Sequence, residues 1–166
     1  MKLKLTLLSL ILTLVSCGNN AVNVVKKGSF SDIQGVTVGD LFDKRFEDGD
    51  WSSEKNNIGQ TIVTFKGKTL PYRGNIPTGV LNDYDFKLWF MSMCQTVQAV
   101  QAMSVLKGVA SWDDVAQRTW PVGSEMTITF LITDVENKTF ELNTCDAPQW
   151  PLGCHGNQFS PYLRGN

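Results

Sequence analysis

His155 is the single histidine of the chain and directly follows Cys154. A thiol and an imidazole can act as a nucleophile and its base, and both can bind zinc. Neighbours in sequence rarely reach the geometry that a nucleophile and its base need. One histidine with two cysteines also falls short of a tetrahedral zinc set. The pair therefore favours a surface histidine beside a disulfide over catalysis or metal binding.

The cysteines offer a second chemistry, which is oxidation. Cys145 and Cys154 flank a segment that contains proline and glycine and can turn back on itself. In an oxidising compartment we expect these two cysteines to be bonded, which would stabilise the fold by about 2–3 kcal/mol. Cys94 lies among apolar residues and would then be a buried small hydrophobic residue. A disulfide that includes Cys94 is the alternative.

Two groups of carboxylates could serve acid–base or cation chemistry. Asp113 and Asp114 are adjacent, so on a helix they would point about 100° apart, and acids in a first turn stabilise the helix dipole. A helix cap is the better interpretation of this pair. The acidic residues around Gly49 lack the ligand pattern of a calcium loop and favour a turn between a helix and a strand.

Alternation of apolar and polar residues predicts four strands in two hairpins. The first hairpin turns at residues 56–59 and the second at residues 134–137. The predicted strands are residues 51–55, 61–66, 126–133 and 138–142.

A helix is predicted between Thr37, which can cap its first turn with Asp40, and Glu47. Its apolar residues share one face, and these are Val38, Leu41, Phe42 and Phe46. The predicted fold is therefore α+β, with a four-stranded antiparallel sheet that packs its apolar face on this helix.

Residues 70–123 form an insert between the two hairpins. An irregular opening leads to a predicted helix over residues 86–106, and a second helix is predicted to begin at Ser111 and stop before Pro121. We expect a helical hairpin that packs on the sheet. Inserted elements on a rigid scaffold often carry recognition. The candidate partner-binding residues here are Trp89, Gln95, Gln98 and Gln101.

The amino-terminal end has the pattern of an export signal. Lys2 and Lys4 precede the apolar run of residues 5–15, which is too short to span a bilayer as a stable helix. The run closes on Leu14-Val15-Ser16-Cys17. This ending resembles the lipobox of bacterial lipoproteins, although Val15 stands where Ala or Ser is usual. A signal peptide with an incidental cysteine and an uncut anchor are the alternatives.

The lipoprotein resemblance implies that Cys17 is acylated, that residues 1–16 are cleaved and that the bilayer is a partner. Gly18, where an aspartate would favour retention in the inner membrane, implies an outer-membrane lipoprotein that faces the periplasm. The expected organisation is Cys17 with a tether over residues 17–25, partly extended, and a single domain over residues 26–166 that contains the insert.

The body of the chain shows a second resemblance. Three of its motifs are Lys26-Lys27-Gly28, Thr37-Val38-Gly39 and Val63-Thr64-Phe65-Lys66-Gly67, and Trp51 lies between the last two. This pattern resembles small, uncharacterised bacterial envelope lipoproteins over residues 25–67. These residues are mostly packing and turn positions, so the resemblance implies a fold and hardly any activity.

Loss of the signal removes two lysines and no acid, so the formal net charge falls from −1 to −3. This charge argues against nucleic acid as a partner. The expected function is a lipid-anchored, non-enzymatic module that binds an envelope protein, without cofactor or metal, in envelope assembly, inhibition or exclusion. The rival hypothesis is a hydrolase or small-ligand binder with a pocket between insert and sheet. Its candidate residues are Asp83, Asp85, Asp113 and His155.

Overall fold

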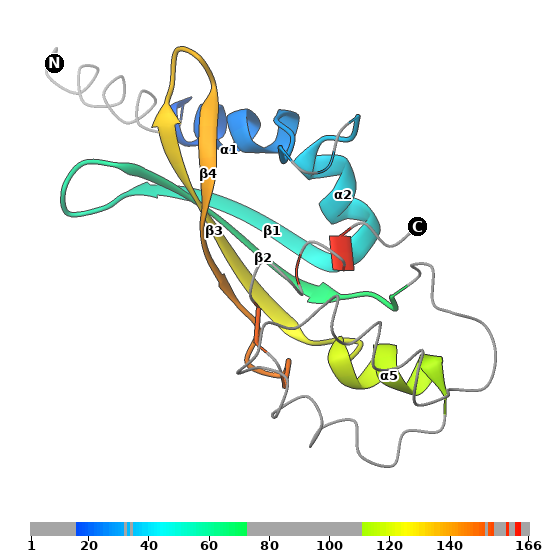
Figure 1. Cartoon of the computed structure of the whole chain (residues 1–166). Coiled ribbons are helices and arrows are strands. Elements are labelled where there is room, and N and C mark those ends of the chain that lie inside the picture. The colour runs from blue at the N-terminus through cyan, green and yellow to red at the C-terminus, as the bar shows by residue number, and fades with distance from the viewer. Residues whose placement is uncertain are drawn as a thin grey trace, which may run out of the picture.

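The structure is a computed structural model that describes residues 16–31, 33, 35–72, 111–151, 153, 154, 159, 162 and 163. Figure 1 shows the chain with its helices and strands labelled. Along the chain the elements are α1 (Ser16–Lys27), α2 (Val38–Arg45), β1 (Phe46–Lys55), β2 (Thr61–Thr69), α5 (Trp112–Thr119), β3 (Glu125–Asp134) and β4 (Thr139–Asp146). No helix within the described ranges is long and apolar enough to cross a membrane.

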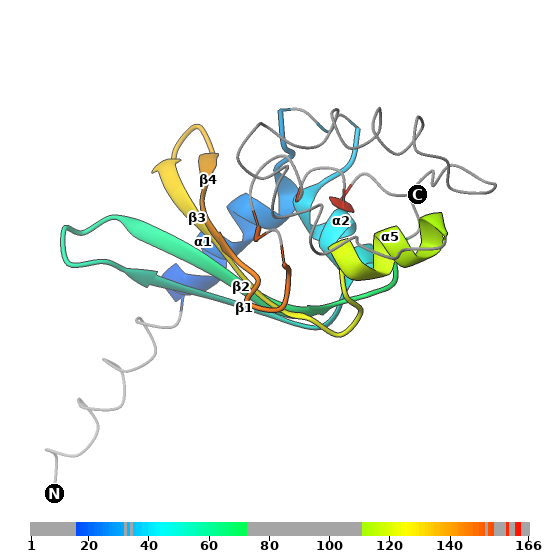
Figure 2. The same ribbon diagram turned by 60° about the horizontal axis from the view of Figure 1, so that its bottom comes forward.

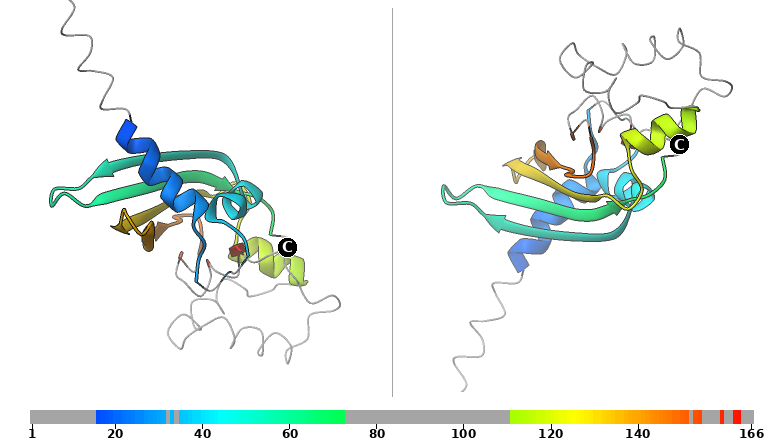
Figure 3. Two further views of the ribbon diagram at one scale, coloured as in Figure 1. Left: turned by 90° about the horizontal axis from the view of Figure 1, so that it is seen from above. Right: turned by 90° about the horizontal axis from the view of Figure 1, so that it is seen from below.

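The four strands form one antiparallel sheet in the order β1-β2-β3-β4. Both α1 and α2 contact the sheet, and α1 crosses its strands on one side (Figure 3). The sequence-based prediction of an α+β fold with a four-stranded antiparallel sheet is therefore confirmed. Both hairpins also occur where alternation indicated them, although β1 and β4 are longer than expected.

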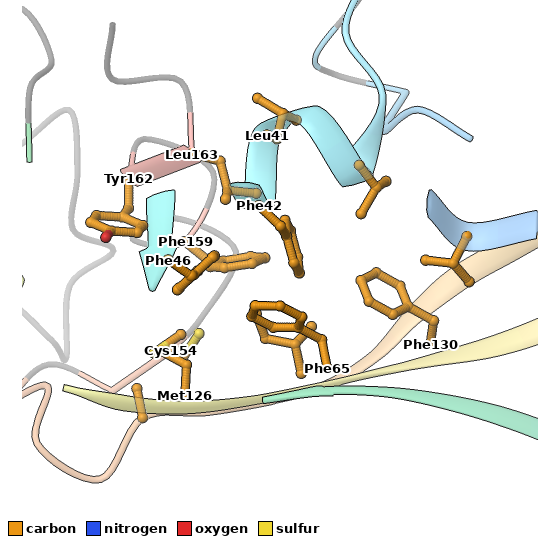
Figure 4. Close-up of a cluster of buried hydrophobic side chains, with 14 of the residues drawn as sticks. Leu41, Phe42, Phe46, Phe65, Met126, Phe130, Cys154, Phe159, Tyr162 and Leu163 are labelled. Carbon is orange, nitrogen blue, oxygen red and sulfur yellow. The ribbon is translucent and has the colours of Figure 1, made fainter. Parts of the chain in front are cut away.

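The core lies between the sheet and the helices, and aromatic rings fill most of it. Phe42 points from α2 toward the sheet, where its ring centroid lies 4.6 Å from that of Phe65 and 6.1 Å from that of Phe130 (Figure 4). Phe159 and Tyr162, from the end of the chain, are buried against the same cluster. Burial of several large rings in one cluster supplies much of the hydrophobic stabilisation of a domain this size.

The start of α2 follows the capping pattern in the sequence. The Thr37 hydroxyl accepts a hydrogen bond from the Asp40 amide at 3.1 Å and donates one to the Asp40 carboxylate at 2.8 Å. The end differs from the prediction, because α2 stops at Arg45 and Phe46 already belongs to β1. Phe46 is still buried in the core, as its place on the predicted apolar face required.

The predicted acidic turn around Gly49 is wrong. Glu47, Asp48 and Asp50 belong to β1, and the sheet register shifts between Glu47 and Asp50. Asp48 has a φ of 54°, and its carboxylate forms an ion pair with Lys68 of β2 at 2.9 Å. The irregular backbone forms a bulge within β1. The segment therefore continues as an edge strand, although its sequence resembles a turn.

The extended conformation expected for part of residues 17–25 is also wrong, because this segment belongs to helix α1. Val24 and Val25 are buried in the core, whereas Asn20 and Asn23 are exposed. The ammonium group of Lys26 lies 5.7 Å from the ring centre of Trp51. Valine-rich sequence favours extended structure locally, but burial of one helical stripe against the sheet overrides that preference.

Helix α5 matches its prediction closely. Ser111 caps it by accepting a hydrogen bond from the Asp114 amide at 3.2 Å, and the helix ends at Thr119, before Pro121. Buried Thr69 joins the next turn to β2, because its hydroxyl donates to the Pro121 carbonyl at 2.7 Å and accepts from the Ser124 amide at 2.9 Å. The helix predicted over residues 86–106 lies outside the described residues.

Candidate functional site

Cys145 and Cys154 are joined by a disulfide with their Cα atoms 5.5 Å apart, and this is the pair that the sequence favoured. Between them, Ala147 and Trp150 are buried in the core. The Trp150 ring centroid lies 5.3 Å from that of Tyr162. The disulfide therefore fastens β4 to a loop that packs on the end of the chain. Its place in the core indicates a structural role.

The polar contacts of Tyr162 also hold the fold together. Its hydroxyl lies within hydrogen-bonding distance of the Arg45 carbonyl, at 2.7 Å, and of the Leu70 carbonyl, at 2.8 Å. Burial raises the pKa of the Tyr162 hydroxyl well above its ordinary range. Arg45 is itself buried and donates from Nε to the Leu163 carbonyl at 3.2 Å. These groups join the segment around Tyr162 to the residues that flank the β1–β2 hairpin.

The face of the sheet that points away from α1 and α2 has no described helix over it; we call it the outer sheet face. Its position follows from the register, because Val63, Phe65, Ile128 and Phe130 are buried on the opposite face and residues alternate along each strand. On the two central strands the outer sheet face consists of Ile62, Thr64, Lys66, Thr127, Thr129 and Leu131.

Hydroxyl groups organise the outer sheet face. Thr129 of β3 is the centre of a small network, with its Oγ1 2.7 Å from Thr144 Oγ1 of β4. The same oxygen accepts hydrogen bonds from Asn143 Nδ2 and from the Thr144 amide, both at 3.1 Å. Beside this network, Ile62 and Leu131 are paired across β2 and β3, and both are partly exposed. The surface combines a fixed polar network with a small apolar pair toward the hairpin turns.

Acidic residues border this face on both edge strands. Asp50 and Glu54 stand on β1, and Glu141 and Asp146 stand on β4, all exposed and in register with outer-face residues of the central strands. The register of both edge strands is irregular. The pairing of β1 with β2 shifts after Glu47, and the pairing of β4 with β3 shifts after Thr129. Bulges and charges at an edge disfavour pairing with another strand. The arrangement therefore suits contact through the face more than through the edges.

A shallow pocket of about 180 Å³ lies beside α5. Its walls are Pro71, Tyr72, Asp113, Ala116, Gln117, Trp120 and Val122. The Tyr72 and Trp120 rings stack with their centroids 4.4 Å apart, and burial raises the pKa of the Tyr72 hydroxyl while nearby Arg45 opposes the change. Small-molecule sites usually enclose about 300–1,000 Å³. This pocket is smaller and contains one carboxylate, that of Asp113.

The other predicted site residues are distributed as follows. Cys17 lies in the first turn of α1. Outside the described residues lie Cys94, the partner-binding candidates Trp89, Gln95, Gln98 and Gln101, and three candidates of the rival hypothesis, Asp83, Asp85 and His155. The predicted insert is therefore represented by α5 and its flanks alone.

The outer sheet face was not among the predicted sites. A signal for it was present, because Thr127, Thr129 and Thr133 alternate with buried residues along β3. Alternation shows that these hydroxyls share a face, but it does not show which residues of the other strands stand beside them. That information requires the register of the whole sheet.

Comparison of the chain with known protein families, characterised proteins and solved structures finds no match. Within the described part of the chain, no three or more His, Cys, Asp or Glu side chains are grouped so that they could hold a metal ion. This part of the chain has a partly apolar sheet face with acidic margins and the shallow pocket beside α5.

Proposed function

We propose that the chain is a lipid-anchored protein of the bacterial envelope, attached through acylated Cys17 to the outer membrane on its periplasmic side, whose domain binds another protein without catalysing a reaction. The observation that carries the proposal is the sequence from Lys2 to Cys17, in which a basic start and a short apolar run end on a lipobox. The second resemblance, over residues 25–67, agrees with an envelope lipoprotein.

The position of Cys17 supports a close attachment. Buried Val24 lies seven positions after Cys17 in α1, which corresponds to a helical rise of about 10 Å. Acyl chains on Cys17 would therefore hold the domain close to the bilayer surface, without a long flexible linker between them. One chain would bind only marginally, and the two or three chains of a lipoprotein would bind firmly.

The anchor is tested by labelling cells with a clickable fatty-acid analogue. Wild-type protein should become labelled and fractionate with membranes, whereas Cys17→Ala should carry no label and appear as an uncut precursor or a soluble product. The matched control is the Cys145→Ser and Cys154→Ser double variant, which removes two other cysteines and should keep the label. Unchanged labelling of Cys17→Ala would show that the lipobox interpretation is wrong.

Protein binding is supported by the form of the outer sheet face. It combines hydroxyl groups with the partly exposed Ile62–Leu131 pair, and it has acidic margins. Protein–protein interfaces commonly combine apolar contact area with hydrogen-bonding groups. The acidic margin favours a partner with basic residues around its own contact surface. The insert remains the second predicted binding surface. Its candidate residues are Trp89, Gln95, Gln98 and Gln101.

Site-specific photocrosslinking in the native envelope tests this proposal. A photoreactive amino acid at Thr64, on the outer sheet face, should yield one defined protein adduct, whereas the same group at exposed Asp43 of α2 should yield none. A third position, Gln98, tests the insert. Adducts from Gln98 without any from Thr64 would move the binding surface to the insert. Absence of a defined adduct at both would refute the protein-binding proposal.

The rival, a hydrolase or small-ligand binder, has one observation in its favour, which is the pocket beside Asp113. Its small volume and single carboxylate make it the weaker candidate. An Asp113→Asn variant with unchanged partner capture would agree with a protein-binding role for the domain.

A further inference from the structure

The two hairpin turns of the sheet lie at one end of the molecule. In the strand order β1-β2-β3-β4 with antiparallel neighbours, the β1–β2 turn and the β3–β4 turn must share an end, and the connection into β3 lies at the other. In Figure 1 these turns lie toward the left and the top, and α5 lies at the lower right. The sheet therefore has a turn end and an α5 end.

The start of α1 lies on the side of the turn end. The residue after α1, Gly28, is hydrogen-bonded to the start of α2, where the Val38 amide donates to the Gly28 carbonyl at 2.8 Å. From there α1 leads back across the sheet, and Figures 1, 2 and 3 all show its beginning on the side of the two turns and opposite α5. Cys17 belongs to the first turn of this helix.

Each turn presents an apolar side chain to solvent. Ile58 in the first turn is 79% exposed, and Val135 in the second is 59% exposed. Among the described residues the other exposed large hydrophobic side chains are Val122, beyond α5, and Leu142, on β4. Half of these side chains therefore lie at the turn end, which is also where α1 begins.

Side-chain hydrogen bonds fix both turns in shape. In the first, the Asn56 carbonyl oxygen Oδ1 accepts from the amides of Ile58 at 3.1 Å and Gln60 at 2.9 Å. In the second, the Asp134 carboxylate accepts from the Asn137 amide at 2.9 Å and from its Nδ2 at 2.7 Å. The polar groups at the base of each turn are thus used internally, while the apolar side chain projects.

The charges at the turn end are compatible with a lipid surface. Lys55 stands beside the first turn and Lys138 within the second, and both are exposed. Lysine can place its aliphatic part along an apolar surface and its ammonium group among lipid headgroups. Glu54, Asp134 and Glu136 lie at the same end and outnumber these two lysines, so contact would depend on the apolar side chains and not on attraction to anionic lipid.

We infer that the turn end of the domain rests on the bilayer, with Ile58 and Val135 inserted at its interface beside the acylated start of α1. This inference rests on the proposed attachment through Cys17. The beginning of α1 and the two turns form three points of contact, which would fix the orientation of the domain as well as its distance from the membrane. The α5 end then faces away from the bilayer.

The experiment places a photoreactive amino acid in the full chain, in the native envelope, in place of Ile58, Val135 or Val122. Val122 is the matched control, because it is an exposed valine in a turn, at the α5 end, and 54% exposed. After irradiation, adducts are separated into lipid and protein adducts by mass spectrometry. The inference expects lipid adducts at Ile58 and Val135 and none above background at Val122.

Three results would overturn it: lipid adducts at all three positions equally, lipid adducts at neither or only one turn, or protein adducts in place of lipid at both turns. Protein adducts would indicate that a partner or a second copy of the chain covers this end. Acylation of Cys17 is measured in the same samples. An unacylated chain would refute the proposed anchor, whereas an acylated chain without lipid adducts at the turns would refute only the orientation.

Discussion

The hydroxyl of Tyr162 lies 2.7 Å from the carbonyl oxygen of Arg45, where α2 ends and β1 begins, 117 residues earlier in the chain. The same hydroxyl reaches the carbonyl of Leu70, 2.8 Å away at the end of β2. Arg45 in turn donates to the Leu163 carbonyl. These hydrogen bonds fasten the segment around Tyr162 to both ends of the first hairpin. Tyr162 and Arg45 are buried there.

Removal of this hydroxyl should weaken the fold measurably. Tyr162→Phe keeps the ring in the core but leaves two carbonyl groups without this donor, so the free energy of unfolding should fall by about 1–3 kcal/mol. Urea denaturation followed by tryptophan fluorescence measures the change. As a control, Ser52→Ala, which removes an exposed hydroxyl of β1, should change stability by no more than about 0.5 kcal/mol. Equal stability of Tyr162→Phe and wild type would mean that the hydroxyl contributes nothing.

The same burial predicts sensitivity to alkali. The pKa of Tyr162 is raised in the folded state, so the folded protein holds this proton more tightly than the unfolded chain, whose tyrosine pKa is about 10. The stabilisation is complete below about pH 10 and is lost progressively as the pH rises above that value. Tyr72, whose pKa burial also raises, should add to the loss.

Urea midpoints measured across this range provide the check. Wild type should lose stability steeply above about pH 10, and Tyr162→Phe should lose it less steeply because one of the two tyrosine hydroxyls with a raised pKa is gone. Identical slopes for the two proteins would show that Tyr162 ionises as readily in the folded state as in the unfolded one.

The disulfide should stabilise the domain because it closes a loop and so restricts the unfolded chain. Cys145 and Cys154 are nine residues apart in sequence, and closure of a loop of that size is expected to contribute about 2–3 kcal/mol. The Cys145→Ser and Cys154→Ser double variant should lose this amount in urea denaturation. Wild type treated with a reducing agent should match the variant, while the variant itself should not respond to the reducing agent. A free Cys145 in freshly purified exported protein would contradict the pairing.

Local sequence signals predicted the elements that depend on local interactions. The caps at Thr37 and Ser111 placed the starts of α2 and α5, and alternation placed β3. Helix α1 was missed because its valines favour extended structure locally, and only the sheet, built from residues far along the chain, buries Val24 and Val25 as a helical stripe.

The missed features of the candidate site have the same origin. The outer sheet face brings together Thr64, Thr129 and Thr144 from three strands, so it could be identified only once the register was known. The Tyr162–Arg45 contact joins distant residues through an irregular segment, for which sequence contains no periodic signal. By contrast, the prediction for Cys17 needs no register, because an export signal is predicted from a linear pattern of residues.

Close packing around Gly67 of β2 leads to the last prediction. Gly67 lies on the inner side of the sheet, where an alanine Cβ would stand 2.7 Å from Cζ of the Phe65 ring and 3.2 Å from Cβ of Phe46. The Phe65 ring is 1% exposed and packs 4.6 Å from the ring of Phe42, centroid to centroid, so it has no free space into which it could move.

Gly67→Ala should therefore lower the free energy of unfolding by about 1–3 kcal/mol, since overpacking displaces side chains or backbone. The neighbouring variant Lys66→Ala changes an exposed residue on the outer sheet face and should shift stability by no more than about 0.5 kcal/mol. Urea midpoints of the two variants, measured beside wild type, make the comparison. If Gly67→Ala were as stable as Lys66→Ala, the Phe65 ring would have room to move, and the close packing of this part of the core would be refuted.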